Sequence, residues 1–402
     1  MKQIAIIGGG PGGLMVAEKL AQAGCSVTVF ERKPSLGRKF LMAGRGGLNL
    51  THSEPLESFL ERYGVARSFL EKPIRDFPPE ALRAWCEGLG QETFVGSSGR
   101  VFPRAMKASP LLRAWLQRLN GLGVEARLSH SWRGWTKDGA LRFETDEGEK
   151  TFQADATVLA LGGASWPKLG TDGIWADILR ARGVEVAPFQ PANCGFVVAW
   201  SDVFKQRCAG QPLKSVRLRH NGRSVQGDVM MNSNGIEGGA VYALSAPLRD
   251  SITATGQAVL HIDLRCGVSE SDLTARLSAG RGSQSLSTCL KKTAGLSAVA
   301  TVLLHEHRSS AELNTLAPAA LARLIKNFPL TLTAPFGLEK SISSAGGICL
   351  TELDENFRLK KLPGVYALGE MLDWEAPTGG YLLQASFSMA VAAAKHLALV
   401  IH

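Results

Sequence analysis

The stretch that decides the fold is Ile4-Ala5-Ile6-Ile7-Gly8-Gly9-Gly10-Pro11-Gly12-Gly13. Its four apolar residues predict a short buried strand, and the glycines after them predict a tight turn. Apolar residues then recur at helical spacing as far as Gly24, so a helix is expected there. Ser26–Phe30 is expected to form a second strand, which ends before Glu31. Strand, turn, helix and strand together make a βαβ unit.

The glycines of this stretch have the G-x-G-x-x-G spacing of dinucleotide-binding turns. Gly8 allows the tight turn, Gly10 lets a pyrophosphate approach the backbone, and Gly13 lets helix and strand pack closely. Pro11 and Gly12 belong to the same expected site, because the amino-terminal end of a helix attracts anions. The turn therefore predicts a dinucleotide phosphate site.

Glu31 stands where a carboxylate can accept hydrogen bonds from ribose hydroxyls. It would repel a 2′-phosphate, although Arg32 beside it leaves that exclusion incomplete. FAD and NAD are both compatible with these residues. Two alternatives are a glycine-rich turn of another α/β protein and a signal peptide. The signal peptide is disfavoured, because five glycines and a proline interrupt the apolar run.

The length of 402 residues suits two domains, or one domain with a large insertion. The seven cysteines are scattered, without a C-x-x-C pair or zinc-like spacing. This pattern favours a reducing cytoplasm and disfavours a dithiol–disulfide reductase. No metal site is expected, because the histidines of His305-Glu306-His307 would point apart on a helix. No membrane-spanning segment is expected either.

The net charge is +9. A basic protein can bind an anionic cofactor or a nucleic acid. We expect the cofactor, because basic residues do not alternate with aromatic ones as on an RNA-binding platform. A flavin-bearing protein that binds RNA or modifies tRNA stays open as the alternative function, with cations such as Lys291, Lys292, Arg323 and Lys326.

Two further segments are glycine-rich. The run Gly44-Arg45-Gly46-Gly47-Leu48-Asn49 can lay backbone N–H groups against a ligand, and Arg45 could pair with a phosphate or a flavin carbonyl. Thr157–Ser165 predicts a buried strand that ends at a glycine pair, where a parallel strand would meet a ligand. The candidate ligand-binding residues of these segments are Gly46, Asn49, Ala160, Gly162 and Gly163.

The last 60 residues repeat the order of strand, glycine and helix. An apolar strand leads to Gly369 and Glu370, and Gly379-Gly380-Tyr381-Leu382 opens an apolar helix that runs to about Leu399. A helix amino-terminus beside a flavin would stabilise the anionic reduced ring. Glu370, or Asp373 nearby, could accept hydrogen bonds from ribitol hydroxyls. A second site for the far end of a long cofactor favours FAD over NAD.

Between these segments the pattern changes. Residues 195–267 alternate as antiparallel strands do, and residues 270–328 contain short helices. We therefore expect an α/β fold with a Rossmann-like FAD-binding domain in two segments, 1–191 and 341–402. An inserted substrate domain, 192–340, has a β part at about 192–267 and 330–340 and a helical part at about 268–329.

The chain resembles the HI0933-like (YhiN/BaiN-type) flavoproteins over essentially its whole length. The resemblance rests on the first βαβ unit, Gly37-Arg38-Lys39, Val101-Phe102-Pro103, Ala160–Pro167 and Thr378–Gln384. It implies FAD in the amino-terminal site, a β-barrel-like part and a helical part in the insert, and a role for Lys39 at the cofactor. Such proteins are similar to reductases of conjugated enones in steroid-like substrates, or to amine oxidases.

Two departures from the family pattern lie where flavin contacts are expected. Gly44–Asn49 stands where the family commonly has Gly-Gly-Gly-Arg-Cys-Asn, and Leu382 replaces the Asn of Gly-Gly-Tyr-Asn-Leu-Gln. These departures indicate a divergent subgroup of the family that the chain resembles. We predict an FAD-dependent oxidoreductase that acts on a small organic substrate, with the flavin reduced by substrate or by transiently bound NAD(P)H. The sequence identifies no catalytic acid or base. An NAD-binding module without flavin is a further alternative.

Overall fold

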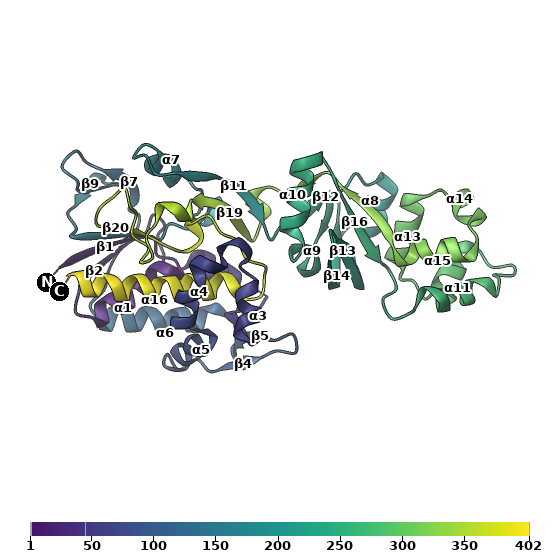
Figure 1. Ribbon diagram of the computed structural model, residues 1–402, viewed down its shortest axis with the longest axis horizontal. Coiled ribbons are helices and arrows are strands. Elements are labelled where there is room, and N and C mark those ends of the chain that lie inside the picture. The colour runs from purple at the N-terminus through teal and green to yellow at the C-terminus, as the bar shows by residue number, and fades with distance from the viewer. Residues whose placement is uncertain (1, 45, 402) are drawn as a thin grey trace. The chain divides into compact units, whose positions relative to one another are not determined.

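The computed structural model describes residues 2–44 and 46–401. The chain divides into two compact units (Figure 1). One unit consists of Met1–Gln190 and Ser343–His402, and is called the Rossmann unit below. The other consists of Pro191–Ile342 and is called the insert.

A five-stranded sheet forms the centre of the Rossmann unit, in the order β20-β10-β1-β2-β6. Every pair of neighbours in it is parallel. Residues Ile4–Ile7 of β1 are buried, which explains why this strand is apolar without alternation. The predicted Rossmann-like α/β fold is confirmed. The strands are β1 (Gln3–Ile7), β2 (Ser26–Phe30), β6 (Glu125–Arg127), β10 (Ala156–Leu159) and β20 (Val365–Ala367).

Helix α1 (Pro11–Gln22) connects β1 to β2, and its first turn follows the glycine run directly. Helix α16 (Tyr381–Ile401) packs against α1 and α4 (Arg67–Asp76) (Figure 1). By length and composition, helix α16 could cross a membrane. Half of its apolar 18-residue stretch is buried within the protein, however. These contacts are typical of the core helix of a globular unit.

The remaining elements of the Rossmann unit surround this core. Pro73 lies inside helix α4 and does not end it. The helical region is broken near Gly64, which has a φ of +51°, and at Phe77, which precedes Pro78 and leaves the helical conformation with a φ of −135° and a ψ of 78°. The elements are α2 (Arg38–Ala43), β3 (Thr51–His52), α3 (Leu56–Glu61), η1 (Gly64–Ala66), α5 (Pro79–Glu87), β4 (Thr93–Val95), β5 (Arg100–Pro103), α6 (Ala108–Gly121), β7 (Ser131–Trp135), β8 (Leu141–Thr145), β9 (Gly148–Phe152), η2 (Pro167–Leu169), α7 (Trp175–Arg180), β11 (Val186–Ala192), β19 (Ser343–Ile348), η4 (Leu350–Glu352) and η5 (Gly369–Met371).

The insert contains a seven-stranded antiparallel sheet in the order β17-β16-β13-β14-β15-β12-β18. The pairings establish the sheet, while its closure into a barrel stays a prediction. The strands are β12 (Phe196–Val197), β13 (Pro212–His220), β14 (Arg223–Asn232), β15 (Gly235–Glu237), β16 (Ala258–Asp263), β17 (Phe328–Leu332) and β18 (Ala334–Pro335).

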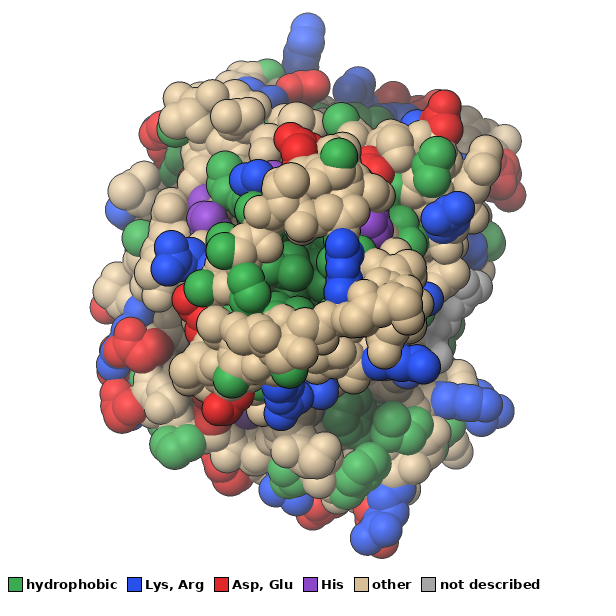
Figure 2. Space-filling view, turned by 90° about the vertical axis from the view of Figure 1, so that its right-hand side faces the viewer, with side chains coloured by type: hydrophobic (Ala, Val, Ile, Leu, Met, Phe, Trp, Pro, Cys, Tyr) green, Lys and Arg blue, Asp and Glu red, His purple; other side chains and the backbone are tan. Residues whose placement is uncertain are grey.

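Short helices complete the insert. Three of them fall within residues 195–267, where antiparallel strands were predicted, so that prediction is wrong for these segments. Figure 2 shows the face at its helical end, where apolar side chains gather in a hollow and Lys and Arg side chains lie at the margin. The helices are α8 (Asp202–Cys208), α9 (Gly239–Tyr242), α10 (Ser245–Thr255), α11 (Glu270–Ser278), α12 (Leu286–Lys292), α13 (Ala298–His307), α14 (Ser310–Thr315), α15 (Pro318–Lys326) and η3 (Leu338–Lys340).

Candidate cofactor site

Four of the segments predicted to bind the cofactor follow neighbouring strands of the five-stranded sheet. The Gly8–Gly13 turn follows β1, Glu31 follows β2, Ala160–Gly163 follows β10, and Gly369–Glu370 follows β20. These strands are parallel, so their carboxyl ends lie at one edge of the sheet. Ligands of open α/β sheets bind at this edge. The fold therefore brings together residues that are more than 350 positions apart in the chain.

The first glycine turn has little space on its protein side. Gly8 has a φ of +110°, and a Cβ there would lie 2.3 Å from the carbonyl oxygen of Ala160. A Cβ on Gly13 would lie 2.0 Å from the oxygen of Gly8, whereas a Cβ on Gly10 would meet nothing within 4 Å. Gly10 is the N-cap of α1, and Pro11 is its first residue. The N–H groups of Gly12 and Gly13 have no acceptor within the helix, so they can bind a phosphate.

Glu31 is fixed by the backbone around it. Its carboxylate accepts hydrogen bonds from the N–H groups of Gly9 and Lys33, both at 2.9 Å. Burial raises its pKa, although these N–H groups and the charges of Arg32 and Lys33 act in the opposite direction. Each oxygen keeps a lone pair that can accept from a ribose hydroxyl. Arg32 forms an ion pair with Asp172 at 2.5 Å, so its contact with a cofactor stays a prediction.

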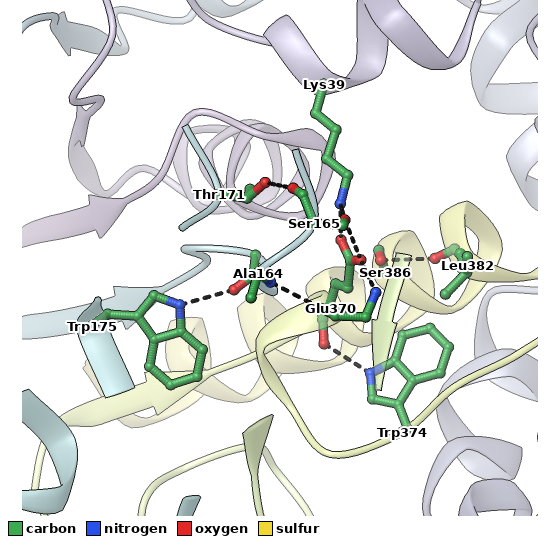
Figure 3. Close-up of polar contacts among 12 residues, drawn as sticks. Lys39, Ala164, Ser165, Thr171, Trp175, Glu370, Trp374, Leu382 and Ser386 are labelled. Atoms are coloured by element: carbon green, nitrogen blue, oxygen red, sulfur yellow. Dashed lines mark hydrogen bonds and ion pairs between the residues drawn. The ribbon is translucent and has the colours of Figure 1, made fainter. Parts of the chain in front are cut away.

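Lys39 and Glu370 meet at the same edge of the sheet (Figure 3). The Nζ of Lys39 lies 2.6 Å from a carboxylate oxygen of Glu370 and 2.6 Å from the hydroxyl of Ser165. The other oxygen of Glu370 accepts from the N–H of Ser344 at 3.1 Å. Sequence reasoning did not select Ser165 or Ser344, because nothing in the local pattern links them to a lysine on α2.

The glycine pair after β10 packs against β19. A Cβ on Gly163 would lie 1.9 Å from the hydroxyl of Ser344, and that hydroxyl accepts from the N–H of Ala164 at 3.0 Å. Gly162 has a φ of +72°, and its carbonyl accepts from the indole N–H of Trp175 at 3.0 Å (Figure 3). The strand end therefore has a fixed shape that a larger residue at position 163 would distort.

The glycine-rich run after α2 is only partly described, because Arg45 lies outside the described residues. Gly46 has open space around its Cβ position. Asn49 donates from Nδ2 to the carbonyls of Thr51 at 2.8 Å and Val101 at 3.1 Å. Its Oδ1 is buried, and none of the described groups donates a hydrogen bond to it. A buried acceptor of this kind can be satisfied by an N–H or O–H group of a ligand.

The second glycine turn, before α16, is held by the rest of the unit. Gly379 and Gly380 have φ values of +141° and +91°. A Cβ on Gly380 would lie 2.5 Å from the backbone of Thr51. The hydroxyl of Tyr63 donates to the carbonyl of Tyr381 at 2.9 Å and so holds the first residue of α16.

Tyr381 also takes part in a polar cluster. Its hydroxyl donates to Glu54 at 2.5 Å, and Arg62 donates to both oxygens of the same carboxylate. Burial acts to raise the pKa of Glu54, but the hydrogen bonds from Arg62 and Tyr381 outweigh it and lower that pKa. Burial and the bond to Glu54 raise the pKa of Tyr381. His52 stacks on the Tyr381 ring with centroids 5.6 Å apart.

Two further candidate residues, Gly369 and Leu382, accept hydrogen bonds through their backbone carbonyls. The carbonyl of Gly369, which has a φ of +81°, accepts from the indole N–H of Trp374 at 2.8 Å. The carbonyl of Leu382 accepts from the hydroxyl of Ser386 at 2.8 Å (Figure 3). Which of the candidate residues touch the cofactor stays a prediction, although most of them lie along one sheet edge.

A parallel sheet with a dinucleotide-binding turn and a second glycine turn defines a Rossmann-type nucleotide-binding protein. The chain belongs to the HI0933-like family: the family described as "HI0933-like protein Rossmann domain" matches residues 2–396. The resemblance inferred from the motifs is thereby confirmed.

Similar proteins cover nearly the whole chain. It is 26% identical to the 3-dehydro-bile acid delta(4,6)-reductase of Clostridium scindens, over 96% of either chain. It is 25% identical to the ribosomal RNA dihydrouridine synthase of Haemophilus influenzae, over 97% of this chain and 96% of that protein. Among solved structures, a 3-ketosteroid delta1-dehydrogenase from Sterolibacterium denitrificans has the same fold, with a TM-score of 0.56, 12% identity and full coverage of both chains.

These matches agree with the class predicted from the sequence. The protein is a flavin-dependent oxidoreductase, and FAD is its cofactor. The fit is supported by the open Gly10 position, the partly free carboxylate of Glu31 and the buried Oδ1 of Asn49.

Proposed function

We propose that the protein reduces a carbon–carbon double bond that is conjugated to a carbonyl group. The observation that carries this proposal is the end-to-end match to two kinds of relative, a bile acid reductase and a ribosomal RNA dihydrouridine synthase. Both names describe the saturation of such a bond: in a 3-oxo steroid nucleus in one case, and in the uracil ring in the other. The shared reaction class is therefore the best-supported one for this chain.

Different residues of the site would hold different parts of FAD. The Gly8–Gly13 turn would hold the pyrophosphate, Glu31 the ribose, and Glu370 the ribitol chain. When bound, FAD supplies the two-electron chemistry. Lys39 neutralises Glu370 and fixes its orientation, since the two groups are 2.6 Å apart. The first turn of α16 places its positive end at a fixed position, because Tyr381 is bonded at both its hydroxyl and its carbonyl.

For the primary substrate we propose a small polycyclic enone, and for the electron donor transiently bound NADH or NADPH. The overall reaction consumes one NAD(P)H and one proton and adds one hydrogen to each carbon of the double bond. The dispersed cysteines, free in the described part of the chain, support the cytoplasm as the proposed location.

The test is anaerobic. We expect NADH or NADPH to bleach the flavin absorbance, and a 3-oxo-Δ4 steroid added afterwards to restore it with formation of the saturated ketone. Restoration by oxygen alone, with no turnover of any enone or uracil compound, would contradict the proposal. A Gly13→Val variant, which cannot form the glycine turn, serves as the cofactor-free control.

A second candidate is the reduction of uracil within RNA. It is favoured by the net charge of +9 and by the two ribosomal RNA dihydrouridine synthases, from Haemophilus influenzae and Escherichia coli, among the relatives. Incubation of the reduced protein with unmodified ribosomal RNA, followed by mass spectrometry of nucleosides, tests it. A mass gain of two hydrogens on uridine is the expected result, and unchanged uridine under conditions where the steroid turns over would exclude it.

A further inference from the structure

We infer that the insert carries a separate phosphate-binding groove that holds the backbone of an RNA strand. The groove has a volume of about 380 Å³ and is lined by Lys214, Ser215, Gln226, Arg265, Gly295 and Ser297, among others. All of these residues belong to the insert, so the groove exists independently of the cofactor site. The choice of RNA as the ligand rests on the second candidate function above, whereas the groove itself does not.

Two cations of the groove lack partners of opposite charge among the described residues. Lys214 lies on β13 and Arg265 follows β16, and neither forms an ion pair with a carboxylate in the described part of the chain. The Nε of Arg265 is also buried and donates to no acceptor there. A buried donor without an acceptor is unfavourable, and an anion in the groove would satisfy it.

The guanidinium of Arg265 is placed by a glycine. Gly295 has a φ of +69°, and a Cβ on it would lie 2.9 Å from Nη2 and 3.1 Å from Nε of Arg265. The absence of a side chain at Gly295 leaves room for the guanidinium against this backbone. The planar fork of an arginine is suited to bidentate contact with a phosphate.

A helix adds to the positive potential. Ser297, which lines the groove, is the N-cap of α13, a helix of ten residues. Its hydroxyl accepts from the N–H of Ala300 at 3.1 Å. The remaining first-turn N–H groups and the helix dipole favour an anion at this end.

The carboxylates near the groove are already engaged. Asp263 is almost fully buried, lies 2.6 Å from the Nζ of Lys326 and accepts from the N–H of Arg265 at 2.9 Å. Asp228 accepts from the N–H of Ser215 at 2.8 Å. Neither carboxylate forms an ion pair with Lys214 or Arg265 in the described part of the chain.

The distribution of charge indicates a polyanion as the ligand. The insert has 16 Lys and Arg against 10 Asp and Glu, although it holds well under half of the chain. The Rossmann unit has 29 against 26. Lys214, Ser215 and Gln226 line the groove from its exposed side, so a strand can lie across it without entering a closed cavity. Phosphates of a nucleic acid backbone bind such surfaces through Lys and Arg.

The test compares RNA binding by the FAD-loaded protein and two matched double variants. K214Q/R265Q removes two charges from the groove, and K205Q/R223Q removes two charges from the insert outside it. The probe is a fluorescein-labelled single-stranded RNA of 20 nucleotides rich in uridine, followed by anisotropy from 50 to 300 mM salt. Flavin absorbance and circular dichroism establish that each variant is folded.

We expect K214Q/R265Q to weaken binding at least tenfold. The slope of log affinity against log salt should fall by about 1.4, because each phosphate that a cation neutralises on a single strand adds ~0.7 to that slope. K205Q/R223Q is expected to change affinity less than threefold. Equal binding by both double variants, or no binding by the parent protein at 50 mM salt, would overturn the inference.

Two further measurements separate this site from the proposed reaction. NADPH and inorganic phosphate are added as competitors, and displacement of the RNA by micromolar NADPH would assign the groove to a nucleotide and overturn the RNA assignment. Reduction of a 3-oxo-Δ4 steroid by K214Q/R265Q should equal that of the parent protein. RNA binding that survives without any uridine reduction would contradict the second candidate function and leave the groove intact.

Discussion

Helices α1 and α16 both begin at glycine turns, but their amino-terminal ends differ. At α1, the N-cap Gly10 has open space at its Cβ position, and no side chain caps the helix. At α16, Gly380 is packed against Thr51, and Tyr381 is held by hydrogen bonds to Tyr63 and Glu54. The same order of strand, glycine and helix therefore gives an end that is open to a ligand and an end that is fixed by the protein.

The difference suggests that the two helix ends have different functions. An open helix end binds an anion directly through its N–H groups. A helix end held by side chains keeps its dipole at one position, which matters where charge develops in a reaction. Substitutions at the two turns should therefore affect cofactor binding and stability in different proportions.

The largest effect is expected at Gly13. A Gly13→Val substitution places carbon atoms within 2.0 Å of the Gly8 carbonyl oxygen, so α1 cannot approach β1. We expect loss of FAD and a loss of stability of about 3 kcal/mol. The matched control is Gly10→Ala. Its Cβ would meet no protein atom within 4 Å, so the thermal stability should be kept. The added methyl group would occupy the space expected for the pyrophosphate, so FAD retention should be lost. Full FAD content in Gly10→Ala would show that no phosphate lies against that residue.

Gly380→Ala should mainly cost stability. The added Cβ meets the backbone of Thr51 at 2.5 Å, and the φ of +91° is strained for alanine, so we expect a loss of about 2–3 kcal/mol in urea unfolding. Gly256→Ala is the control for φ alone, because that glycine has a φ of +80° and nothing within 4 Å of the Cβ position. It should lose about 1 kcal/mol. Equal losses would show that the contact with Thr51 does not hold the second turn.

The Lys39–Glu370 pair should affect FAD affinity. Lys39→Met and Glu370→Gln each remove a charge-assisted hydrogen bond at the edge of the sheet, and we expect each to weaken FAD binding about tenfold, or ~1.4 kcal/mol. Titration of the apoprotein with FAD measures this. The double variant should lose less than the two single losses combined, since the groups act as a pair. Full additivity would contradict their coupling.

The cluster at α16 predicts a pH dependence. Because the folded-state pKa of Glu54 is lowered, its ionised form stabilises the protein above the pKa of the unfolded chain, about 4.3. That contribution is lost as the pH falls through the lower folded value. Parent protein and Glu54→Gln should therefore differ by a constant amount from pH 8 to pH 5 in urea unfolding and converge in more acidic solution. A difference that grows below pH 5 would show that the pKa of Glu54 is raised in the folded protein and not lowered.

Tyr381→Phe should have the smallest effect. It removes the hydroxyl that donates to Glu54 but keeps the ring, which packs against Phe59 and His52, and Arg62 still pairs with the carboxylate. We expect a loss of about 1 kcal/mol, measured by thermal unfolding, with unchanged FAD content. A colourless Tyr381→Phe protein would instead place this hydroxyl in direct contact with the cofactor.

Local sequence was sufficient for the parts of the protein that depend on neighbouring residues. The βαβ unit at the start of the chain follows from apolar runs and glycine spacing, because strand, turn and helix propensities act over a few residues. The short helices of residues 270–328 follow in the same way, whereas the expectation of strands over residues 195–267 missed α8, α9 and α10. The assignment of FAD as the cofactor rested on the family motifs.

Contacts between distant residues were decided only by the tertiary structure. Lys39 meets Glu370 across 331 positions, and Tyr381 meets Glu54 across 327. Arg265 lies over Gly295 because the end of β16 approaches the turn before α13. No local pattern encodes such pairs, since a hydrogen bond depends on the distance in space between two groups. The sequence by itself therefore determined a Rossmann-type flavoprotein with an insert, and the fold decided which charges are paired and which remain free to bind a ligand.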